Sequence, residues 1–336
     1  MNAADTAAAP AALDSRVLDI DADAVIGQVS DRLREILSRK LSRRGLVVAM
    51  SGGIDSSVCA ALAVKAIGAP RVYGLMLPER DSSGESTTRG RQLAEHLGIR
   101  YEVFDIAGTL DAMGCYSWRD EAIRRVFPGY GAGWKNKIVF SGGLDGRMSH
   151  FQLVVQAPDG QVSQARLDAP EYLQIVAATN FKQRIRKTME YFHADRLNYA
   201  VVGTPNRLEY DQGFFVKNGD GSADLKPIAH LYKSQVYALA RHMGLPAEIC
   251  NAVPTTDTYS LAQGQDEFYF SLPYQQMDLA LWAHNHGRSA AQLATALGIS
   301  EEQAVNVYRD IEAKRRTTRY LHLKPVLIEP VAEIDA

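Results

Sequence analysis

The sequence predicts an α/β protein built on a doubly wound, mostly parallel sheet with helices on both faces. Short apolar runs at 46–50, 71–77 and 197–203 are typical of parallel strands that are buried on both sides. Ala-rich or amphipathic segments separate the first runs, so the chain opens in the order helix, strand, helix, strand, helix, strand. This order implies right-handed βαβ crossovers and therefore a parallel sheet.

The helices follow from apolar spacing and from capping residues. Val25, Val29 and Leu33 recur at helical spacing in the first predicted helix. Ser300 and Gln303 form a capping box at the start of the last one. In chain order, we expect helices over 21–43, 56–67, 89–97, 111–127, 172–192 and 231–243, and two more within 288–320.

Two further features complete the predicted secondary structure. A third strand is expected at 101–106. A Pro-Asp-Gly turn within 157–160 separates two alternating segments and therefore predicts a β-hairpin.

One domain accounts for most of the chain. The length of 336 residues allows one large α/β domain or about two smaller ones. We interpret 21–330 as a single domain that ends in a helical extension, and the Ala-rich stretch 1–20 as a disordered tail. The Gly-rich, polar stretch 128–170 is interpreted as an insertion in this domain.

The composition excludes several classes of protein. A hydrophobic content of 46% with 23% charged residues indicates a globular core, and a net charge of −2 gives no sign of a nucleic-acid partner. Nowhere does an apolar run approach about 18 residues, so we expect no membrane span. Cys59, Cys115 and Cys250 lie far apart without a CxxC pair, which argues against a zinc site or disulfides and favours the cytoplasm.

The most informative segment is SGGIDSS at 51–57, the turn between the first strand and the next helix. Glycines let the backbone approach a ligand closely, and the helix start offers unpaired N–H groups and a partial positive charge. These features indicate a phosphate or pyrophosphate site, although the turn lacks the GxxxxGK[ST] pattern. A bridging Mg²⁺ explains why a carboxylate, Asp55, lies among the donors. The plain alternative is a polar turn in which Asp55 caps the helix.

The segment SGGLDG at 141–146 repeats some of these letters. It has only a weak strand before it and no helix after it, so we interpret it as a loop.

SGGIDSS resembles the pyrophosphate loop of the N-type ATP pyrophosphatases, and other stretches narrow the resemblance to the NAD synthetase family. These stretches are LPERDSS (77–83), TNFKQRIRKTM (179–189), VVGTPNRLEYDQGFFVKNGDGSADLKPI (201–228), LYKSQVYALARHMGLP (231–246) and VPTTD (253–257). The resemblance covers about 25–325. It implies a fold like that of the adenine nucleotide alpha hydrolases, and an enzyme, a C–N ligase, that adenylates nicotinic acid adenine dinucleotide with ATP and Mg²⁺ and then amidates it to NAD with ammonia.

The resemblance also assigns the ATP side residue by residue. Asp55 and Glu209 would bind Mg²⁺, and Asp55 and Lys233 would serve catalysis at the phosphates. The plain alternatives are an exposed lysine for Lys233, a solvated helix face for Arg184 and a loop cap for Thr255. The full set implied for ATP is Ser51, Gly52, Gly53, Asp55, Ser56, Ser57, Leu77, Arg184, Thr204, Lys233 and Thr255.

On the substrate side, the resemblance implies that Phe214 stacks on a ring, Lys217 pairs with a substrate charge and Asn180 lies near the nicotinate. Asp220 and Asp224 would accept hydrogen bonds from ribose or fix the loop. Asp224 is also the candidate catalytic group for deprotonating ammonium. Core packing is the alternative for Phe214.

The resemblance also implies partners. Glutamine-dependent relatives carry a long extra nitrilase-like domain, and the match here begins near residue 25, so we expect free ammonia or a separate glutaminase as the nitrogen source. The family forms two-fold dimers, so we expect a homodimer.

Three departures from the family lie on the substrate side. Pro205 replaces the usual aspartate after Gly-Thr, the stretch around 128–170 is about 40 residues longer than expected for the family, and Tyr269 stands where an acidic residue is usual. A related amide ligase that acts on a different carboxylic acid therefore stays open as the second hypothesis.

Two readings from other classes also remain. Residues 292–311 imitate a DNA-binding helix-turn-helix, but the second helix starts with Glu-Glu-Gln, which would repel phosphate. A thiolating pyrophosphatase acting on tRNA would need reactive cysteines, and the three here have no cysteine or histidine partner at useful spacing.

Overall fold

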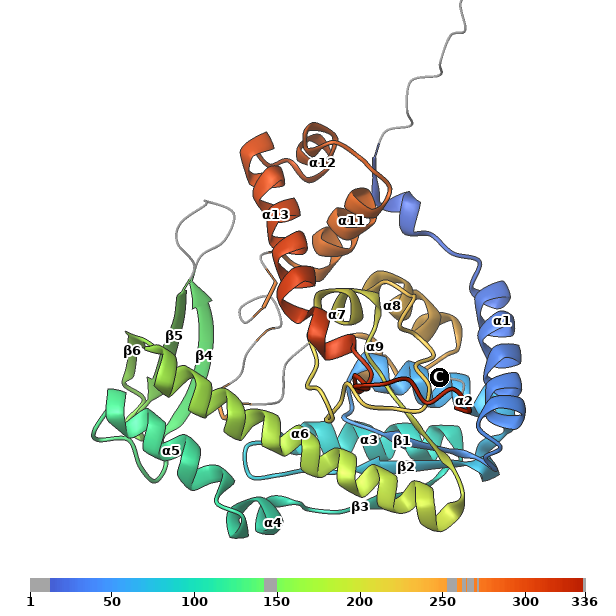
Figure 1. Cartoon of the computed structure of the whole chain (residues 1–336), viewed down its shortest axis with the longest axis horizontal. Coiled ribbons are helices and arrows are strands. Elements are labelled where there is room, and N and C mark those ends of the chain that lie inside the picture. Colours follow the sequence, from blue (N-terminus) through green and yellow to red (C-terminus); the bar gives the residue numbers. More distant parts are fainter. Residues whose placement is uncertain are drawn as a thin grey trace, which may run out of the picture.

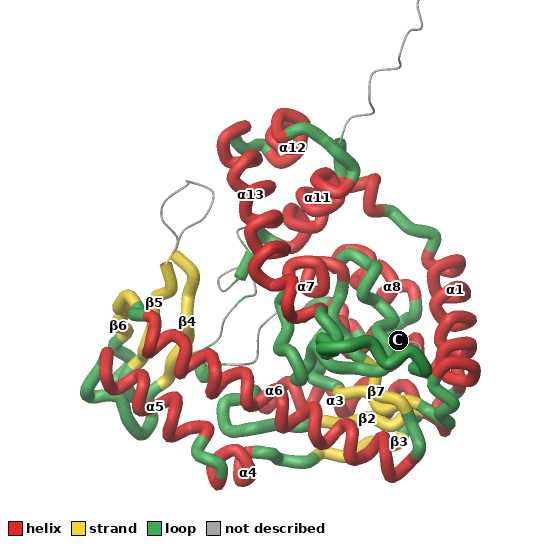
Figure 2. The backbone as a smooth tube through the Cα atoms, viewed as in Figure 1, coloured by secondary structure: helices red, strands yellow, loops and turns green. Residues whose placement is uncertain are grey.

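The computed structural model describes residues 13–141, 150–252, 259–261, 264, 269–270 and 272–334. Its centre is a four-stranded parallel sheet in the order β3–β2–β1–β7 (Figures 1 and 2). The chain leaves β1 for β2 and β3 on one side and later returns to place β7 on the other, so the predicted doubly wound topology is confirmed. The strands are β1 (Leu46–Ala49), β2 (Val72–Met76), β3 (Arg100–Val103) and β7 (Ala200–Val202).

Helices cover both faces of this sheet, as predicted. Leu46 and Val48 face one core and Val47 faces the other, because successive strand side chains point to opposite faces. The first core is closed by α1 (Ala22–Glu35), α2 (Ile54–Ile67), α3 (Gly84–Leu97) and α8 (Lys233–His242). The second is closed by α4 (Ala107–Ala112), α5 (Cys115–Val126) and α6 (Ala169–Leu197).

The region interpreted as an insertion contains a second, antiparallel sheet of three strands. The predicted hairpin is present as β5 and β6, but β4 was not predicted, because its sequence KNKIVFS does not alternate. Ile138 and Leu153 of this sheet pack against Ile123 of α5 and Ile175 of α6. The strands are β4 (Lys135–Ser141), β5 (His150–Gln156) and β6 (Val162–Arg166), and residues 142–146 of the SGGLDG segment lie outside the described residues.

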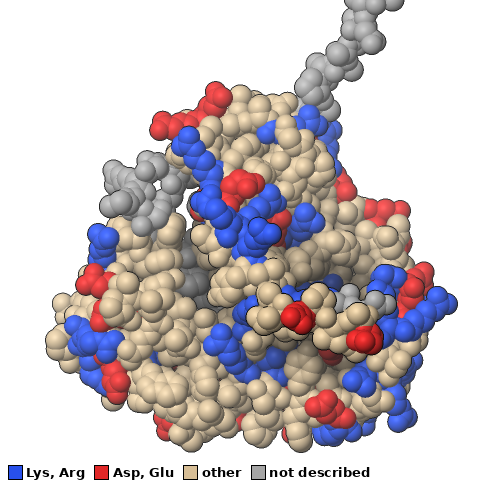
Figure 3. Space-filling view, viewed as in Figure 1, with Lys and Arg blue, Asp and Glu red and all other residues tan. Residues whose placement is uncertain are grey.

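The C-terminal helices pack on their own apolar core beside α7 (Arg207–Gln212). Leu293 and Val307, from the two helices of the helix-turn-helix imitation, are buried there, and on the face in Figure 3 acidic and basic side chains mix over these helices. These helices therefore pack into a core of their own, and the face in Figure 3 is not uniformly basic. The helices are α11 (Tyr274–Asn285), α12 (Ala290–Leu297) and α13 (Glu301–Thr318), preceded by the short α9 (Ala247–Cys250).

The chain already forms regular structure before residue 21. Ser15–Leu18 form a 3₁₀ turn, and Leu18 is buried against the core of the C-terminal helices, whereas residues 1–12 lie outside the described part. Gly114, at φ +85°, divides the single helix expected at 111–127 into α4 and α5. None of the helices in the described ranges is long and apolar enough to cross a membrane.

Candidate active site

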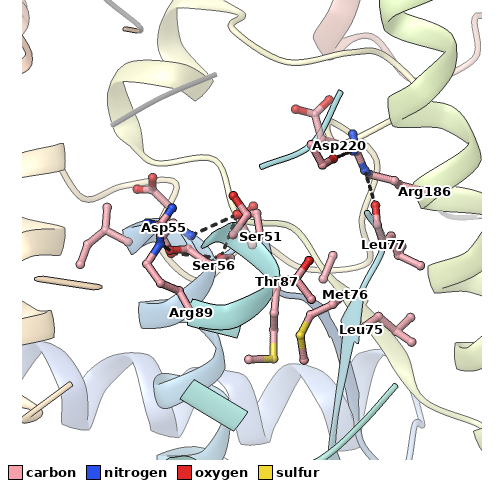
Figure 4. Close-up of a pocket in the computed structure, with 18 of the residues that line it drawn as sticks. Ser51, Asp55, Ser56, Leu75, Met76, Leu77, Thr87, Arg89, Arg186 and Asp220 are labelled. Carbon is pink, nitrogen blue, oxygen red and sulfur yellow. Dashed lines mark hydrogen bonds between the residues drawn. The ribbon is translucent and has the colours of Figure 1, made fainter. Parts of the chain in front are cut away.

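A cavity of about 260 Å³ opens at the carboxyl ends of β1, β2 and β7 (Figure 4). The order in which the chain adds strands to the sheet reverses between β1 and β7. Open α/β sheets bind ligands at such a point, at the carboxyl ends of the strands. Ten residues of the predicted site line the cavity together: Ser51, Gly52, Gly53, Asp55, Ser56, Leu77, Thr204, Glu209, Asp220 and Lys233.

The phosphate loop, residues 51–57, owes its shape to Gly52. This residue has φ +73°, and a Cβ built on it would lie 2.4 Å from the carbonyl oxygen of Ser86 in α3. The hydroxyls of Ser51 and Ser56 lie 3.2 Å apart at the cavity wall. Ser57 is fully buried, does not line the cavity and donates to the carbonyl oxygen of Gly53 at 2.8 Å. The Ser56 hydroxyl donates to the same carbonyl oxygen at 3.1 Å. Ser51 and Ser56 thus line the cavity, where a ligand can reach them, while Ser57 only stabilises the start of α2.

Lys233, Asp55 and Glu209 meet at the floor of the cavity. Lys233 is 2% exposed and donates to the Asp55 carboxylate, and its Nζ lies 3.8 Å from Oε1 of Glu209. Burial alone would lower the pKa of Lys233, but the two carboxylates outweigh it and raise the pKa above its usual value. Asn206 donates to the other Asp55 oxygen at 3.0 Å and also caps α7, the helix that carries Glu209.

These two carboxylates fit a magnesium site. Mg²⁺ is usually held by one or two carboxylates, with substrate phosphates and water completing its coordination. Asp55 comes from the first turn of α2 and Glu209 from the first turn of α7, and both line the cavity beside the phosphate loop. The donor set is therefore suited to a metal that arrives with a nucleotide.

One wall of the cavity comes from α6 and was only partly predicted. Arg186 donates to the carbonyl oxygen of Leu77 at 3.0 Å, at the end of β2. One residue further on, Lys187 forms a buried ion pair with Glu190 at 2.6 Å. Asp220 faces the same cavity, and burial raises its pKa although the backbone N–H of Val216 donates to it at 2.7 Å.

Besides Ser57, two predicted residues on the ATP side are not seen at this cavity. Arg184 lies on α6 two residues before Arg186, and its Nε donates to the carbonyl oxygen of Lys217 at 3.3 Å. Thr255 lies outside the described residues.

On the substrate side, Asn180, Phe214 and Lys217 also lie away from this cavity. Asn180 is on α6 and half-buried. Phe214 stacks on Tyr269 with ring centroids 4.8 Å apart, so the tyrosine that departs from the family pattern packs against the predicted stacking residue. Lys217 donates to the carbonyl oxygen of Tyr320 at 2.7 Å, in the C-terminal segment.

Asp224 has a backbone role in the structure. Its Oδ2 accepts from the N–H of Val201 at 2.7 Å, and the hydroxyl of Tyr191 donates to Oδ1 at 3.4 Å. It therefore secures the edge of β7 and does not line this cavity, and its catalytic role stays a prediction. Of the two aspartates in the GDGSAD sequence, Asp220 is the one that faces the cavity.

One cavity residue, Arg89, was not among the predicted site residues. It lies on α3, and its Nε donates to the carbonyl oxygen of Gly52 in the phosphate loop at 3.2 Å. No motif marks it, because Glu85 and Arg89 have the spacing of an ordinary surface ion pair. The neighbouring run of Ser and Thr at the start of α3, which also lines the cavity, was the available signal.

The cysteines are free and buried in the structure. Cys59 lies in the core under the phosphate loop, and burial, reinforced by Asp55 and Glu209, raises the pKa of its thiol well above the usual value. Since the thiolate is the reactive form, this favours a packing role over the thiol chemistry of a thiolating enzyme.

Known proteins agree with this architecture. The family model described as NAD synthase matches residues 25–125 and 147–319. The chain is 57% identical over 319 residues to the "NH(3)-dependent NAD(+) synthetase" of Rhizobium meliloti (strain 1021), covering 95% of each protein. Two solved structures share the fold: NMN synthetase from Francisella tularensis (TM-score 0.63, 21% identity, 93% of this chain and 100% of that one) and NH3-dependent NAD synthetase from Campylobacter jejuni (TM-score 0.60, 19% identity, 92% and 100%). With a family match across most of its length and a close relative of almost equal extent, the chain belongs to the NAD synthase family.

Proposed function

We propose that this chain is an ammonia-dependent NAD⁺ synthetase. It adenylates the carboxylate of nicotinic acid adenine dinucleotide with ATP, releases pyrophosphate, and then lets ammonia displace AMP to give NAD⁺. The observation that carries the proposal is the cavity in which the SGGIDSS loop, Lys233, Asp55 and Glu209 converge, in a chain that is 57% identical to a protein of that name over nearly its full length.

The first step needs positioning and charge neutralisation more than a protein nucleophile. A carboxylate oxygen of the substrate attacks the α-phosphorus of ATP, the bond from that phosphorus to the bridging oxygen breaks, and pyrophosphate leaves with the electron pair. Backbone N–H groups at the start of α2 and the hydroxyls of Ser51 and Ser56 are well placed to bind the departing phosphates. Lys233 supplies a buried positive charge. The two neighbouring carboxylates raise its pKa, so its side chain stays protonated.

Asp55 and Glu209 would hold Mg²⁺, which, when bound, neutralises phosphate charge. Apart from the metal, these carboxylates keep Lys233 charged and in place through the contacts described above. Thr204, at the end of β7, and Leu77, at the end of β2, would border the nucleotide from opposite sides of β1.

The dinucleotide substrate would be bound mainly by residues that lie outside the cavity. We propose that Phe214, Lys217 and Asn180 contribute to the dinucleotide site and that Thr255 contributes to the phosphate side. In the second step the nitrogen of ammonia attacks the acyl carbon, a proton leaves the nitrogen, and AMP departs. Since Asp220 faces the cavity and Asp224 does not, Asp220 is the better placed aspartate to influence this step.

Partners and location complete the proposal. We propose a homodimer, because apolar side chains such as Val326 and Ile328 are 80% and 99% exposed in the single chain. A separate glutaminase would deliver ammonia where free ammonium is scarce. The three free thiols fit a cytoplasmic enzyme. Light scattering would test the dimer by the mass of the particle.

The deciding experiment measures products with several acids. The purified chain is incubated with ATP, Mg²⁺ and ammonium chloride together with nicotinic acid adenine dinucleotide, nicotinic acid mononucleotide or free nicotinic acid. We expect NAD⁺, AMP and pyrophosphate in equal amounts from the dinucleotide and much less turnover of the other acids. Glutamine alone should not replace ammonium.

The mononucleotide is a necessary comparison, because the structure of an NMN synthetase shares this fold and fold likeness alone does not select the acid. If the mononucleotide were the preferred acid, the NAD⁺ synthetase proposal would fail and the alternative amide ligase would replace it. Formation of ADP in place of AMP would exclude adenylation for either substrate.

A further inference from the structure

Four cationic side chains of the described residues line the cavity, and they differ in how they are engaged. Lys233 is buried between Asp55 and Glu209, and Lys187 is paired with the buried Glu190. Arg186 is held by the Leu77 carbonyl and, at 3.3 Å, by the Ser82 hydroxyl, at the end of β2 rather than at the phosphate loop. The fourth, Arg89, contacts the phosphate loop itself.

Arg89 is fixed directly against the phosphate loop. Its Nε donates to the carbonyl oxygen of Gly52 at 3.2 Å, and Figure 4 shows it beside Asp55 and Ser56. The base of its side chain also lies close to the loop. A Cβ built on Gly52 would lie 3.1 Å from the Cβ of Arg89. The tight contact between Gly52 and α3 therefore fixes the position of the base of the Arg89 side chain.

The anionic partner of Arg89 is weakly held. Nη1 of Arg89 lies 3.2 Å from Oε2 of Glu85, one helical turn earlier, and the Glu85 side chain is 83% exposed. Surface pairs of this spacing contribute little and exchange readily with solvent. Across the residues that the structure describes, Arg89 makes no other side-chain hydrogen bond. Its guanidinium thus has donors that a bound anion can take over at small cost.

We propose that Arg89 is a further catalytic residue, which binds the β- and γ-phosphates of ATP and stabilises the pyrophosphate that leaves in the adenylation step. The inference rests on the proposed function for the identity of the reaction. Negative charge increases on the leaving oxygen as the bond to the α-phosphorus breaks, and a cation at the phosphate loop lowers the energy of that state.

Arginine suits this role because its planar fork can donate to two phosphate oxygens at once. While Nε stays on the Gly52 carbonyl, the two terminal nitrogens would leave Glu85 and turn to the phosphates. The same side chain therefore holds the loop and the anion. No proton transfer is required, since the guanidinium stays charged throughout.

The test compares Arg89→Met and Arg89→Lys with Arg91→Met as the matched control. Arg91 lies on the same helix, is exposed and does not line the cavity. Calorimetry measures the affinity of each full-length variant for inorganic pyrophosphate and for a non-hydrolysable ATP analogue, with Mg²⁺. Steady-state assays with the acid substrate give kcat and KM for ATP, and thermal unfolding confirms that each variant is folded.

We expect Arg89→Met to bind pyrophosphate about tenfold more weakly and to lose kcat by about 100-fold, as when a donor to a transition-state charge is removed. Arg89→Lys should lose about threefold in pyrophosphate affinity, because it keeps a charge but not the fork. It replaces the Met variant in the comparison if that one does not fold. Arg91→Met should match the unmodified chain.

The inference would be overturned if the Arg89 variants bound pyrophosphate within twofold of the unmodified chain, or if Arg91→Met lost as much. Pyrophosphate binding does not depend on which acid is the substrate. A chain that failed to make NAD⁺ but lost pyrophosphate affinity on Arg89→Met would refute the proposed function and still support the role of Arg89.

Discussion

Lys233 and Asp55, 178 residues apart in the chain, form a buried ion pair at the floor of the cavity. Asp55 lies in the first turn of α2, after the central strand, and Lys233 begins α8 far downstream. Glu209, from the first turn of α7, adds a second carboxylate 3.8 Å from the lysine. The first turns of three helices from separate parts of the sequence thus meet at the carboxyl ends of β1 and β7.

Replacing Lys233 by methionine should abolish most activity. The substitution leaves Asp55 and Glu209 facing each other without a buried cation, which costs several kcal/mol in comparable ion pairs, and it removes a positive charge from the phosphate site. We expect a loss of at least about 100-fold in kcat/KM for ATP. Arg241→Met, an exposed change on the same helix, is the control. Near-normal turnover by folded Lys233→Met would contradict the assignment.

The two glycines of the phosphate loop should respond differently to alanine. In Gly52→Ala the new Cβ would meet the Ser86 carbonyl at 2.4 Å, in a backbone with φ +73°. In Gly53→Ala the nearest atom is the Ser51 hydroxyl at 3.4 Å, and φ is −87°. We expect Gly52→Ala to lower the free energy of unfolding by about 1–3 kcal/mol and Gly53→Ala to leave it nearly unchanged. Urea unfolding without nucleotide measures both, and equal losses would rule out this explanation.

Asp278 supports the helix that carries Lys233. It is fully buried on α11, and its Oδ2 accepts from both the N–H and the hydroxyl of Ser234, the second residue of α8. Its other oxygen has no hydrogen-bond partner among the described residues. Burial raises the pKa of Asp278 to about 6, although the hydrogen bonds from Ser234 oppose the shift.

This pKa sets the sign of a pH effect on stability. Between the ordinary value of 3.8 and about 6, the folded chain holds a proton on Asp278 that the unfolded chain has released. The stabilising contribution is therefore complete below the ordinary value and is lost as the pH rises through about 6. A shift of this size corresponds to about 3 kcal/mol.

Asp278→Asn should remove this dependence. The amide oxygen can still accept from Ser234, but the side chain no longer titrates. We expect the free energy of unfolding of the unmodified chain, relative to the variant, to fall by about 2–3 kcal/mol between pH 4 and pH 7. Urea unfolding at several pH values measures it. A constant difference across that range would show that Asp278 does not titrate there.

The parts of the site that follow directly from a strand were predictable. The loop after β1, Leu77 after β2 and Thr204 after β7 all line the cavity, because the carboxyl ends of parallel strands meet at one edge. A residue's place after a buried strand thus fixes its position in space without knowledge of the side-chain packing.

The parts carried on long helices and irregular loops were not predictable in the same way. Arg184 and Arg186 are two residues apart on α6, about 200° around the helix, and apolar spacing could not decide which one faces the cavity. Asp220 and Asp224 share a loop whose turns have no simple period. Arg89 depends on the close contact between Gly52 and α3, which only the folded structure reveals.

The unpredicted strand β4 makes a contact with the segment that follows 253–258. The backbone N–H of Asn136 donates to the hydroxyl of Ser260 at 2.8 Å, and the N–H of Leu261 donates to the Asn136 carbonyl at 3.1 Å. The Asn136 amide also donates to the Tyr130 hydroxyl at 2.7 Å, within the insertion. The family model does not match residues 126–146, which include β4, so this contact links an unmatched stretch of the chain to a matched one.

Ser260→Ala and Tyr130→Phe separate the two ends of this anchor. In Ser260→Ala the fully buried Asn136 loses the acceptor of its backbone N–H, and an unsatisfied buried donor costs about 1–3 kcal/mol. In Tyr130→Phe the Asn136 amide keeps a contact with Ser260 at 3.3 Å, and the link between the segments remains. We therefore expect hydrogen exchange at Leu261 and in β4 to accelerate in Ser260→Ala and to change little in Tyr130→Phe. Equal acceleration in both variants would mean that β4 is held by the packing of its own sheet and not by the residue 259–261 segment.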